Sequence, residues 1–139
     1  MREARSRDEV EQALCLRLRV FCDEQGVDRC AEQDGRDDEA IHLVALEGGR
    51  LVGTCRLLVA GDTVRLGRNA VAGADRGRGI GTALLEAADR VAARSGADRI
   101  RLHAQLGALT LYERSGYVPE GEAFLEEGTE HRAMEKRLA

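Results

Sequence analysis

The sequence predicts an α/β or α+β fold in which helices flank a mixed sheet. Three observations support this prediction. Apolar segments at 41–46, 50–59 and 63–71 follow one another with glycine turns between them, which is typical of consecutive antiparallel strands. A long stretch of helical periodicity follows at 80–92, where apolar residues mark one face. After it, strand and helix patterns alternate to the end of the chain.

The first predicted element is a helix over 8–21, because apolar residues recur there at helical spacing. Ser6 and Asp8 are the candidate N-caps, since either side chain can accept a hydrogen bond from a free helical amide. The segment 23–39 is polar and acidic and contains two glycines, so we expect a loop there.

Glycines delimit the three strands and the long helix. Gly48-Gly49 and Gly61-Asp62 are turn signals between neighbouring strands. The segment 72–81, rich in Gly and Arg, separates the third strand from the helix. Gly96 is a natural C-terminal end for that helix.

The last third of the chain predicts shorter elements. We expect a strand over 99–104 and a short helix over 108–114. A strand begins at Tyr117-Val118, and we expect Pro119 to break it. The last strand is predicted over 132–138.

Composition restricts the class of protein. A chain of 139 residues, 43% apolar and 33% charged, fits a single domain over 1–139 with one hydrophobic core. The net charge of -4 argues against nucleic-acid binding, which usually requires a basic face. No apolar run is long enough to cross a bilayer or to act as a secretion signal, so we expect no membrane partner and a cytoplasmic location.

Cysteine and histidine spacing does not suggest a metal site. The four cysteines form no C-x-x-C pair, and the three histidines lie far apart in the chain. We expect no metal, and free thiols that are mostly buried. The cysteines are Cys15, Cys22, Cys30 and Cys55.

The segment from Arg76 to Thr82 has the features of an anion-binding loop. Its glycines allow the backbone to approach a ligand without a Cβ in the way. The helix that follows presents unpaired amides and a partial positive charge at its N-terminus. Arg76 and Arg78 add two positive charges, so the loop suits a pyrophosphate.

Other interpretations of this loop fit less well. A P-loop requires a Lys before the Ser or Thr that follows its last glycine, and Gly81 is followed directly by Thr82. The dinucleotide motif G-x-G-x-x-G has a different spacing and follows the first strand of a βαβ unit. A glycine-rich turn that only starts a helix remains an alternative.

The motif Arg76-Gly77-Arg78-Gly79-Ile80-Gly81 resembles the R/Q-x-x-G-x-G/A motif of the GNAT acetyltransferases. Downstream, the stretch from Leu102 to Tyr117 resembles the fifth strand of that family and the helix after it. The resemblance implies the GNAT fold, a mixed and mostly antiparallel sheet of six to seven strands flanked by helices. Shorter matches resemble the ElaA-like branch, including 34–37, 40–42 and 124–128 with His131.

The resemblance also implies a co-substrate, acetyl-CoA. In the family, the loop amides hold its pyrophosphate, and the strand at the position of Val71 pairs with its pantetheine arm. The residues expected to bind acetyl-CoA are Ala70, Val71, Arg76, Gly77, Arg78, Gly79, Ile80, Gly81, Thr82, Gln105 and Tyr112.

Acetyl transfer to an amine requires a neutral amine, donors for the oxyanion and a proton for the leaving thiolate. Tyr112 occupies the position where the family carries a tyrosine that donates this proton, although a core aromatic is the simpler interpretation. A backbone amide near Val71, where the family has a bulge, is the expected oxyanion donor. Gly67 and Arg68 occupy the positions nearest to those at which some members of the family carry a Glu that acts as the general base.

The sequence therefore does not assign the general base to a single residue. His131 and Glu127 are the candidates that we prefer, and His103, Glu24 and Asp34 are others. A chain of water molecules, or an amine that arrives neutral, would make a side-chain base unnecessary.

Acidic residues gather in the two segments that should flank the acceptor site, at 24–39 and 120–130. A negative rim would attract a cationic amine, although a solvated acidic loop explains the same pattern. The sequence thus favours an enzyme that acetylates a primary amine of a small molecule or peptide. The resemblance also implies a homodimer, because dimers are common in the superfamily. A non-catalytic coenzyme A-binding sensor and a nucleotide-binding protein are the alternatives.

Overall fold

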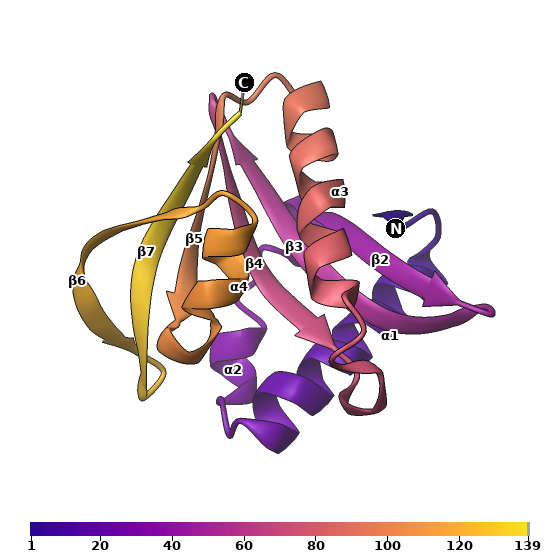
Figure 1. The fold of residues 1–139 in the computed structure, drawn as a ribbon. Coiled ribbons are helices and arrows are strands. Elements are labelled where there is room, and N and C mark those ends of the chain that lie inside the picture. The colour runs from indigo at the N-terminus through magenta and orange to yellow at the C-terminus, as the bar shows by residue number, and fades with distance from the viewer. Residues whose placement is uncertain (139) are drawn as a thin grey trace.

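The structure is a computed structural model that describes residues 1–138, with residues 30 and 31 described by their backbone alone. Seven strands form one sheet in the order β1-β2-β3-β4-β5-β7-β6 (Figure 1). All neighbours are antiparallel except β4 and β5, so the mixed, mostly antiparallel sheet is confirmed. The strands are β1 Arg2–Glu3, β2 Ile41–Glu47, β3 Arg50–Ala60, β4 Thr63–Val71, β5 Arg99–Gln105, β6 Val118–Glu126 and β7 Thr129–Arg137.

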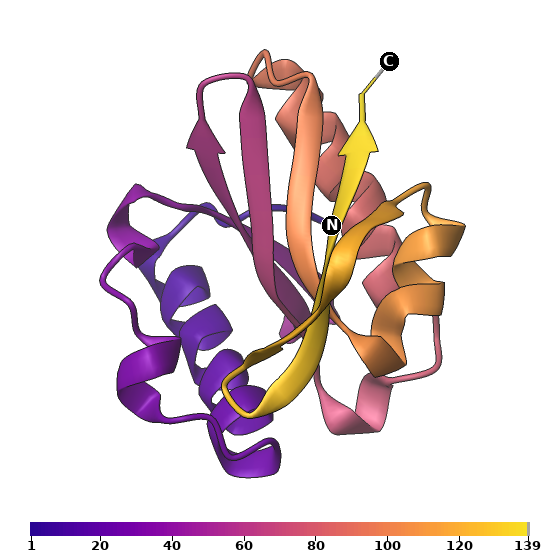
Figure 2. The ribbon, with the colours of Figure 1, turned by 90° about the vertical axis from the view of Figure 1, so that its left-hand side faces the viewer.

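Helices cover both faces of this sheet. Helix α1 lies on one face, and α3 and α4 lie on the other (Figure 2). Between α1 and β2, a π-helical segment, the short helix α2 and a 3-10 turn run across the first face. The helices are α1 Arg7–Arg17, the π-helix Leu18–Glu24, α2 Arg29–Glu32, α3 Ile80–Arg94 and α4 Leu109–Arg114, with 3-10 turns at Asp37–Glu39, Gly73–Asp75 and Leu106–Ala108.

Each face has its own apolar core. On the α1 face, Leu16 and Val20 pack against Val44 of the sheet. On the other face, α3 lies close to β3 because Gly53 has no side chain. A Cβ at Gly53 would lie 2.9 Å from Cγ2 of Ile80, which is closer than real Cβ contacts allow. The start of α3, which follows the glycine-rich loop, is thereby fixed against the sheet.

The sheet opens between β4 and β5. Their parallel pairing runs from Thr63 opposite Arg99 to Arg65 opposite Arg101, and it goes no further. Beyond this point β4 stays with β3, while β5 stays with β7 as far as Gln105. Figure 1 shows the two halves of the sheet diverging toward the end of β4. A V-shaped gap therefore separates the last parts of these two strands.

A β-bulge lies in β4 beside this gap. Arg56 of β3 pairs with Gly67, and Thr54 pairs with Ala70, so two residues of β4 face one of β3. These two residues are Arg68 and Asn69, which lie opposite Cys55, and Arg68 has a positive φ of 54°. The bulge expected from the family resemblance is thus present, a few residues before Val71.

Three boundary predictions were wrong. Segment 23–39 is not a continuous loop, because the π-helix, α2 and a 3-10 turn occupy much of it. Pro119 does not break its strand, because β6 is an edge strand, where a missing N–H is tolerated. The last strand begins at Thr129, three residues earlier than predicted, because β7 forms a hairpin with β6. The strand β1 was not predicted, while Ser6 caps α1 as expected.

The cysteines differ in exposure. Cys55 is buried, Cys22 is half-buried and Cys15 is exposed, so the expectation of mostly buried thiols is wrong for Cys15. The side chain of Cys30 lies outside the described residues. Burial raises the pKa of the Cys55 thiol to about 12, which makes it a poor nucleophile. No helix in the described part of the chain is long and apolar enough to cross a membrane.

Candidate active site

The glycine-rich loop presents a row of backbone amides at the start of α3. Gly77 and Gly79 have φ values of 80° and 82°, a region that other residues rarely adopt. No side chain caps the helix, and the first helical bond runs from the Ala83 amide to the Gly79 carbonyl. The amides before Ala83 therefore have no partner within the helix. A Cβ at Gly77 or Gly79 would meet no atom within 4 Å, so space for a ligand remains above the backbone.

Both arginines of the loop already bind other groups of the protein. Arg76 donates from Nε to the Val71 carbonyl at 3.0 Å and from Nη2 to Glu24 at 2.8 Å. Arg78 pairs with Glu47, and its Nη1 lies 3.6 Å from Asp75. The loop can therefore hold an anion by its backbone, while each arginine would have to exchange a carboxylate for a phosphate.

The end of β4 turns polar backbone groups toward the gap. The Ala72 amide donates to the Val52 carbonyl, so in an antiparallel ladder the groups of Val71 point away from β3. The Val71 carbonyl accordingly accepts from Arg76. Ala70 is buried in the core on the α1 face, and Ile80 is buried in the other core, so both can offer a ligand only their backbone. Across the gap, the Gln105 amide group donates to the Gln25 side chain at 2.9 Å.

Tyr112 lies on α4 where the core meets the gap. It is 8% exposed and packs edge-on against Tyr117, with ring centroids 5.9 Å apart. Burial raises the pKa of its phenol, although a hydrogen bond with Asn69 of the bulge acts in the opposite direction. The phenol thus remains protonated near neutral pH and can act as a proton donor. Tyr112 is both a core residue and a residue of the adjoining cleft, so its two interpretations are compatible.

A cleft of about 460 Å³ adjoins the gap on the face that carries α1. Its floor is formed by β4 and β5, one wall by the segment around α2, and the other wall by the β6–β7 hairpin. Neither Gly77 nor Gly79 lines it, so the cleft and the glycine-rich loop are separate features. Among its lining residues are Phe21, Gln25, Glu32, Asp34, Arg56, Gly67, Arg68, Asn69, His103, Gln105, Tyr112, Glu126, Glu127 and His131.

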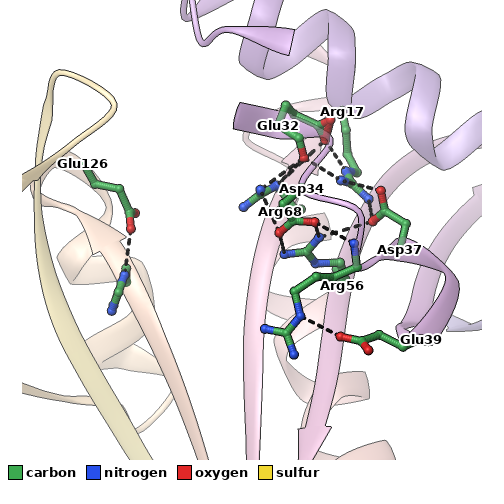
Figure 3. A network of polar contacts seen from close by, with 10 residues as sticks. Arg17, Glu32, Asp34, Asp37, Glu39, Arg56, Arg68 and Glu126 are labelled. Atoms are coloured by element: carbon green, nitrogen blue, oxygen red, sulfur yellow. Dashed lines mark hydrogen bonds and ion pairs between the residues drawn. The ribbon is translucent and has the colours of Figure 1, made fainter. Parts of the chain in front are cut away.

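The wall around α2 is a network of ion pairs (Figure 3). Arg17 is fully buried, and its guanidinium binds Glu32 at 2.6 Å and Asp37 at 2.7 Å. Arg56 binds Asp34 through two hydrogen bonds of 2.8 and 2.9 Å. These arginines neutralise the acidic residues of 32–37, so that part of the expected negative rim does not exist.

The network also fixes the protonation of its carboxylates. The hydrogen bond from Arg56 holds the pKa of Asp34 well below its usual range. Burial alone would raise the pKa of Asp37, but the hydrogen bonds and charges of Arg17 and Arg56 lower it overall. Asp34 is consequently a poor general base, because its lone pairs are committed to a guanidinium.

Two histidines, one on β5 and one on β7, lie near the carboxylate of Glu126 on β6. His103 Nδ1 lies 3.0 Å from Oε1 of Glu126, and His131 Nε2 lies 3.7 Å from its Oε2. The other nitrogen of His131 hydrogen-bonds the Thr129 carbonyl at 2.8 Å. Phe124 lies against both rings, edge-on to His103 and stacked on His131. Figure 3 shows Glu126 on its hairpin, apart from the arginine network.

A family model described as an acetyltransferase (GNAT) domain matches residues 4–138. The chain belongs to the GNAT acetyltransferase family. It is therefore an acyltransferase, as the resemblance of the glycine-rich loop to the family motif implied.

Relatives in sequence and structure agree with this assignment. The uncharacterized N-acetyltransferase YjcF of Bacillus subtilis is 31% identical over 134 residues, covering 96% of each chain. An acyl-CoA N-acyltransferase from Pseudomonas aeruginosa is 33% identical, with a TM-score of 0.84 over 95% of this chain and 92% of that one. Escherichia coli ElaA is 27% identical, with a TM-score of 0.85 and the same coverage. An aminoglycoside 6'-N-acetyltransferase solved with coenzyme A shares the fold, with 18% identity, a TM-score of 0.79 and coverage of 100% and 98%.

The candidate bases of this GNAT acetyltransferase differ in their surroundings. His131 is buried, and a hydrogen bond orients its ring. Glu127 is exposed at the hairpin turn with a φ of 49°, and no hydrogen bond within the described residues orients its carboxylate. Glu24 pairs with Arg76 outside the cleft. No cluster of three or more metal-ligating side chains occurs among the side chains that the structure describes.

Sequence reasoning missed several residues of the GNAT cleft and of the ion-pair network behind its wall. Arg17 lies on the buried stripe of α1, and Arg56 interrupts an otherwise apolar strand. A single arginine among apolar residues is the signal that could have revealed them, since a buried charge needs a partner. Asn69 and the position of Glu126 between two histidines left no such signal, because both depend on how distant segments meet.

Proposed function

We propose that the protein transfers the acetyl group of acetyl-CoA to a primary amine of a small molecule or peptide, by direct attack within a ternary complex. One observation supports this most strongly: a single strand, β4, adjoins both sites. Its bulge at 67–69 lines the cleft, and its end at Val71 contacts Arg76 of the glycine-rich loop. Tyr112 and Asn69, which are hydrogen-bonded to each other, line the cleft beside this strand.

The co-substrate would be held mainly by backbone groups. The amides of Gly77, Gly79, Gly81 and Thr82 would bind the pyrophosphate, and the end of β4 at Ala70 and Val71 would pair with the pantetheine arm. The related aminoglycoside enzyme with coenzyme A bound supports this choice of ligand at the level of the fold. Arg76 and Arg78 would reinforce the phosphate site after leaving their carboxylates, and Gln105 would leave Gln25.

The residues of the cleft suggest roles in the reaction. His131 Nε2 would take a proton from the incoming ammonium, and the freed lone pair would attack the thioester carbonyl. A backbone amide of β4 after the bulge would donate to the oxyanion. As the carbon–sulfur bond breaks, Tyr112 would give its proton to the leaving thiolate. Glu127 is the weaker candidate for the base, because it lacks an orienting partner within the described residues.

Replacing Tyr112 by Phe tests this proposal. A general acid contributes about 10²- to 10⁴-fold, so kcat should fall by about that factor, while the KM for acetyl-CoA should change little. Turnover would be followed as thiol release with a panel of primary amines, and cofactor affinity by calorimetry. A non-catalytic sensor would bind acetyl-CoA with no turnover for any amine. Full activity of the Phe variant would assign the proton donor elsewhere.

The setting of the reaction follows from the same proposal. An enzyme that uses acetyl-CoA would work in the cytoplasm, where this co-substrate is made and used. A homodimer is the assembly that we propose, by analogy with the superfamily, and sedimentation of the purified protein would test it.

A further inference from the structure

The hairpin wall of the cleft contains two hydrogen-bond acceptors that face one another. His131 Nε2 and Glu126 Oε2 are 3.7 Å apart, which is too long for a hydrogen bond between them. Both residues line the cleft. His131 is only 8% exposed, so its ring is fixed in place by packing as well as by hydrogen bonding.

The hydrogen-bond partners decide where the protons lie. The Thr129 carbonyl can only accept, so Nδ1 of His131 carries the hydrogen of that 2.8 Å bond. In the neutral ring, Nε2 is then left with a lone pair. The ionised carboxylate of Glu126 is also only an acceptor, and His103 Nδ1 supplies a hydrogen to Oε1. Oε2 therefore faces Nε2 with no hydrogen from either residue between them.

We infer that this pair is the docking point for the amine of the acceptor, and that Glu126 selects amines that arrive as ammonium ions with at least two N–H bonds. The inference rests on the proposed function and names the residue that chooses its substrate. An ammonium group with a nitrogen about 2.8 Å from each acceptor can donate one N–H to Nε2 and another to Oε2. A hydroxyl has one hydrogen, and a quaternary ammonium has none, so neither satisfies both acceptors.

Water also carries two hydrogens and could donate to both acceptors, but the charge of the site favours binding of a cation. Glu126 and Glu127 give the hairpin wall a negative charge, while the acidic residues of the opposite wall are occupied by Arg17 and Arg56. The cation is therefore attracted to the hairpin side of the cleft. When one N–H proton moves to Nε2, the neutral amine keeps its bond to Oε2, and Glu126 stabilises the imidazolium that forms. One N–H bond breaks and one forms, and the amine lone pair becomes free to attack.

The test observes the histidine nitrogens directly. Protein labelled with ¹⁵N-histidine would be titrated with n-butylammonium and, separately, with tetramethylammonium, which has the same charge but no N–H. His131→Gln identifies the resonances of His131. We expect the Nδ1–H tautomer in the free protein and a shift of Nε2 with butylammonium alone. In Glu126→Gln the apparent Kd for butylammonium should rise about 10-fold or more, since a hydrogen bond to a charged group is lost.

Glu130→Gln is the matched control, because Glu130 is exposed on the same hairpin, carries the same charge and does not line the cleft. It should behave as the native protein does. An Nε2–H tautomer, equal shifts with both cations, or equal weakening in the two variants would overturn the inference. Calorimetry with acetyl-CoA on the same samples separates the two proposals. Cofactor binding without the butylammonium response rejects only the docking site, whereas the response without cofactor binding rejects the proposed function.

Discussion

The glycine-rich loop and the acceptor cleft both adjoin β4, yet one is formed by backbone and the other by side chains. The loop site consists of two glycines with positive φ, a helix start without a side-chain cap, and backbone groups at the end of β4. The cleft is made of side chains from segments far apart in the chain, such as Arg17 with Glu32 and His103 with Glu126. A backbone site binds whatever carries the required phosphates, whereas a side-chain site can change its preference one residue at a time.

This difference predicts that the two regions can be damaged separately. A change in the arginine network should affect stability and leave cofactor affinity nearly intact. A change in the loop should weaken cofactor binding and reduce stability less than a change in the arginine network does. Three substitutions, taken from the largest expected effect to the smallest, test this separation.

Arg17→Met should have the largest effect. It removes the nearest cation from Glu32, which is 2% exposed, and from Asp37, and these carboxylates are left with Arg68 at 3.9 Å and Arg56 at 3.3 Å. Breaking a buried ion pair by removing one partner costs about 3–5 kcal/mol of unfolding free energy. Urea unfolding followed by circular dichroism measures this loss, and calorimetry on the folded variant should still show native affinity for acetyl-CoA.

Arg7→Met is the control for Arg17→Met. Arg7 lies on the same helix, but its side chain is 91% exposed and forms one surface pair with Glu11. Exposed pairs of this kind contribute little, so the urea midpoint should not change measurably. If both variants unfolded at the native midpoint, the wall around α2 would be held by packing and not by its charges.

Gly79→Ala should have an intermediate effect, and it should reduce acetyl-CoA affinity rather than mainly stability. The new Cβ meets no protein atom within 4 Å, but it stands above the amides that face the ligand. Acetyl-CoA affinity should fall about 10- to 100-fold, as expected for the loss of one hydrogen bond to a charged group. The φ of 82° costs a residue with a Cβ roughly 1–2 kcal/mol of stability, less than the loss expected for Arg17→Met.

Gly73→Ala provides the matched control within the same connection. Gly73 has no positive φ, and a Cβ there also meets nothing within 4 Å. Its affinity for acetyl-CoA and its stability should both stay native. Equal losses of affinity in the two variants would mean that general flexibility of the connection, and not the amides at Gly79, binds the anion.

The same difference explains what the sequence could predict. Glycine positions, helix starts and apolar periods are local, so the loop and the elements around it were placed almost to the residue. The arginine network depends on α1, α2 and β3 meeting in space, and no local pattern encodes that meeting. The sequence therefore left two interpretations of the acidic segment, a negative rim and a solvated loop, and neither included the internal neutralisation of residues 32–37. Similarly, Glu126 was one acid among several until β5 and β7 brought two histidines to it.

Glu24→Gln should have the smallest effect, and it tests the comparison where the end of the π-helix contacts the glycine-rich loop. Glu24 holds Arg76 at 2.8 Å, with both side chains nearly half exposed. A phosphate must compete with this carboxylate for the guanidinium. Removing the charge should therefore strengthen acetyl-CoA binding about 1.5- to 5-fold, the range expected for exposed ion pairs.

High salt should abolish this gain, because exposed charges are screened at short range. Asp23→Asn is the control, since Asp23 is the neighbouring acid and pairs only loosely with Arg29 at 3.8 Å, away from the loop. Calorimetry at low and high salt would compare the two variants with the native protein. Weaker binding in Glu24→Gln alone would mean that Glu24 belongs to the cofactor site. The two regions would then share a side chain, and their separation into a backbone site and a side-chain site would fail at this contact.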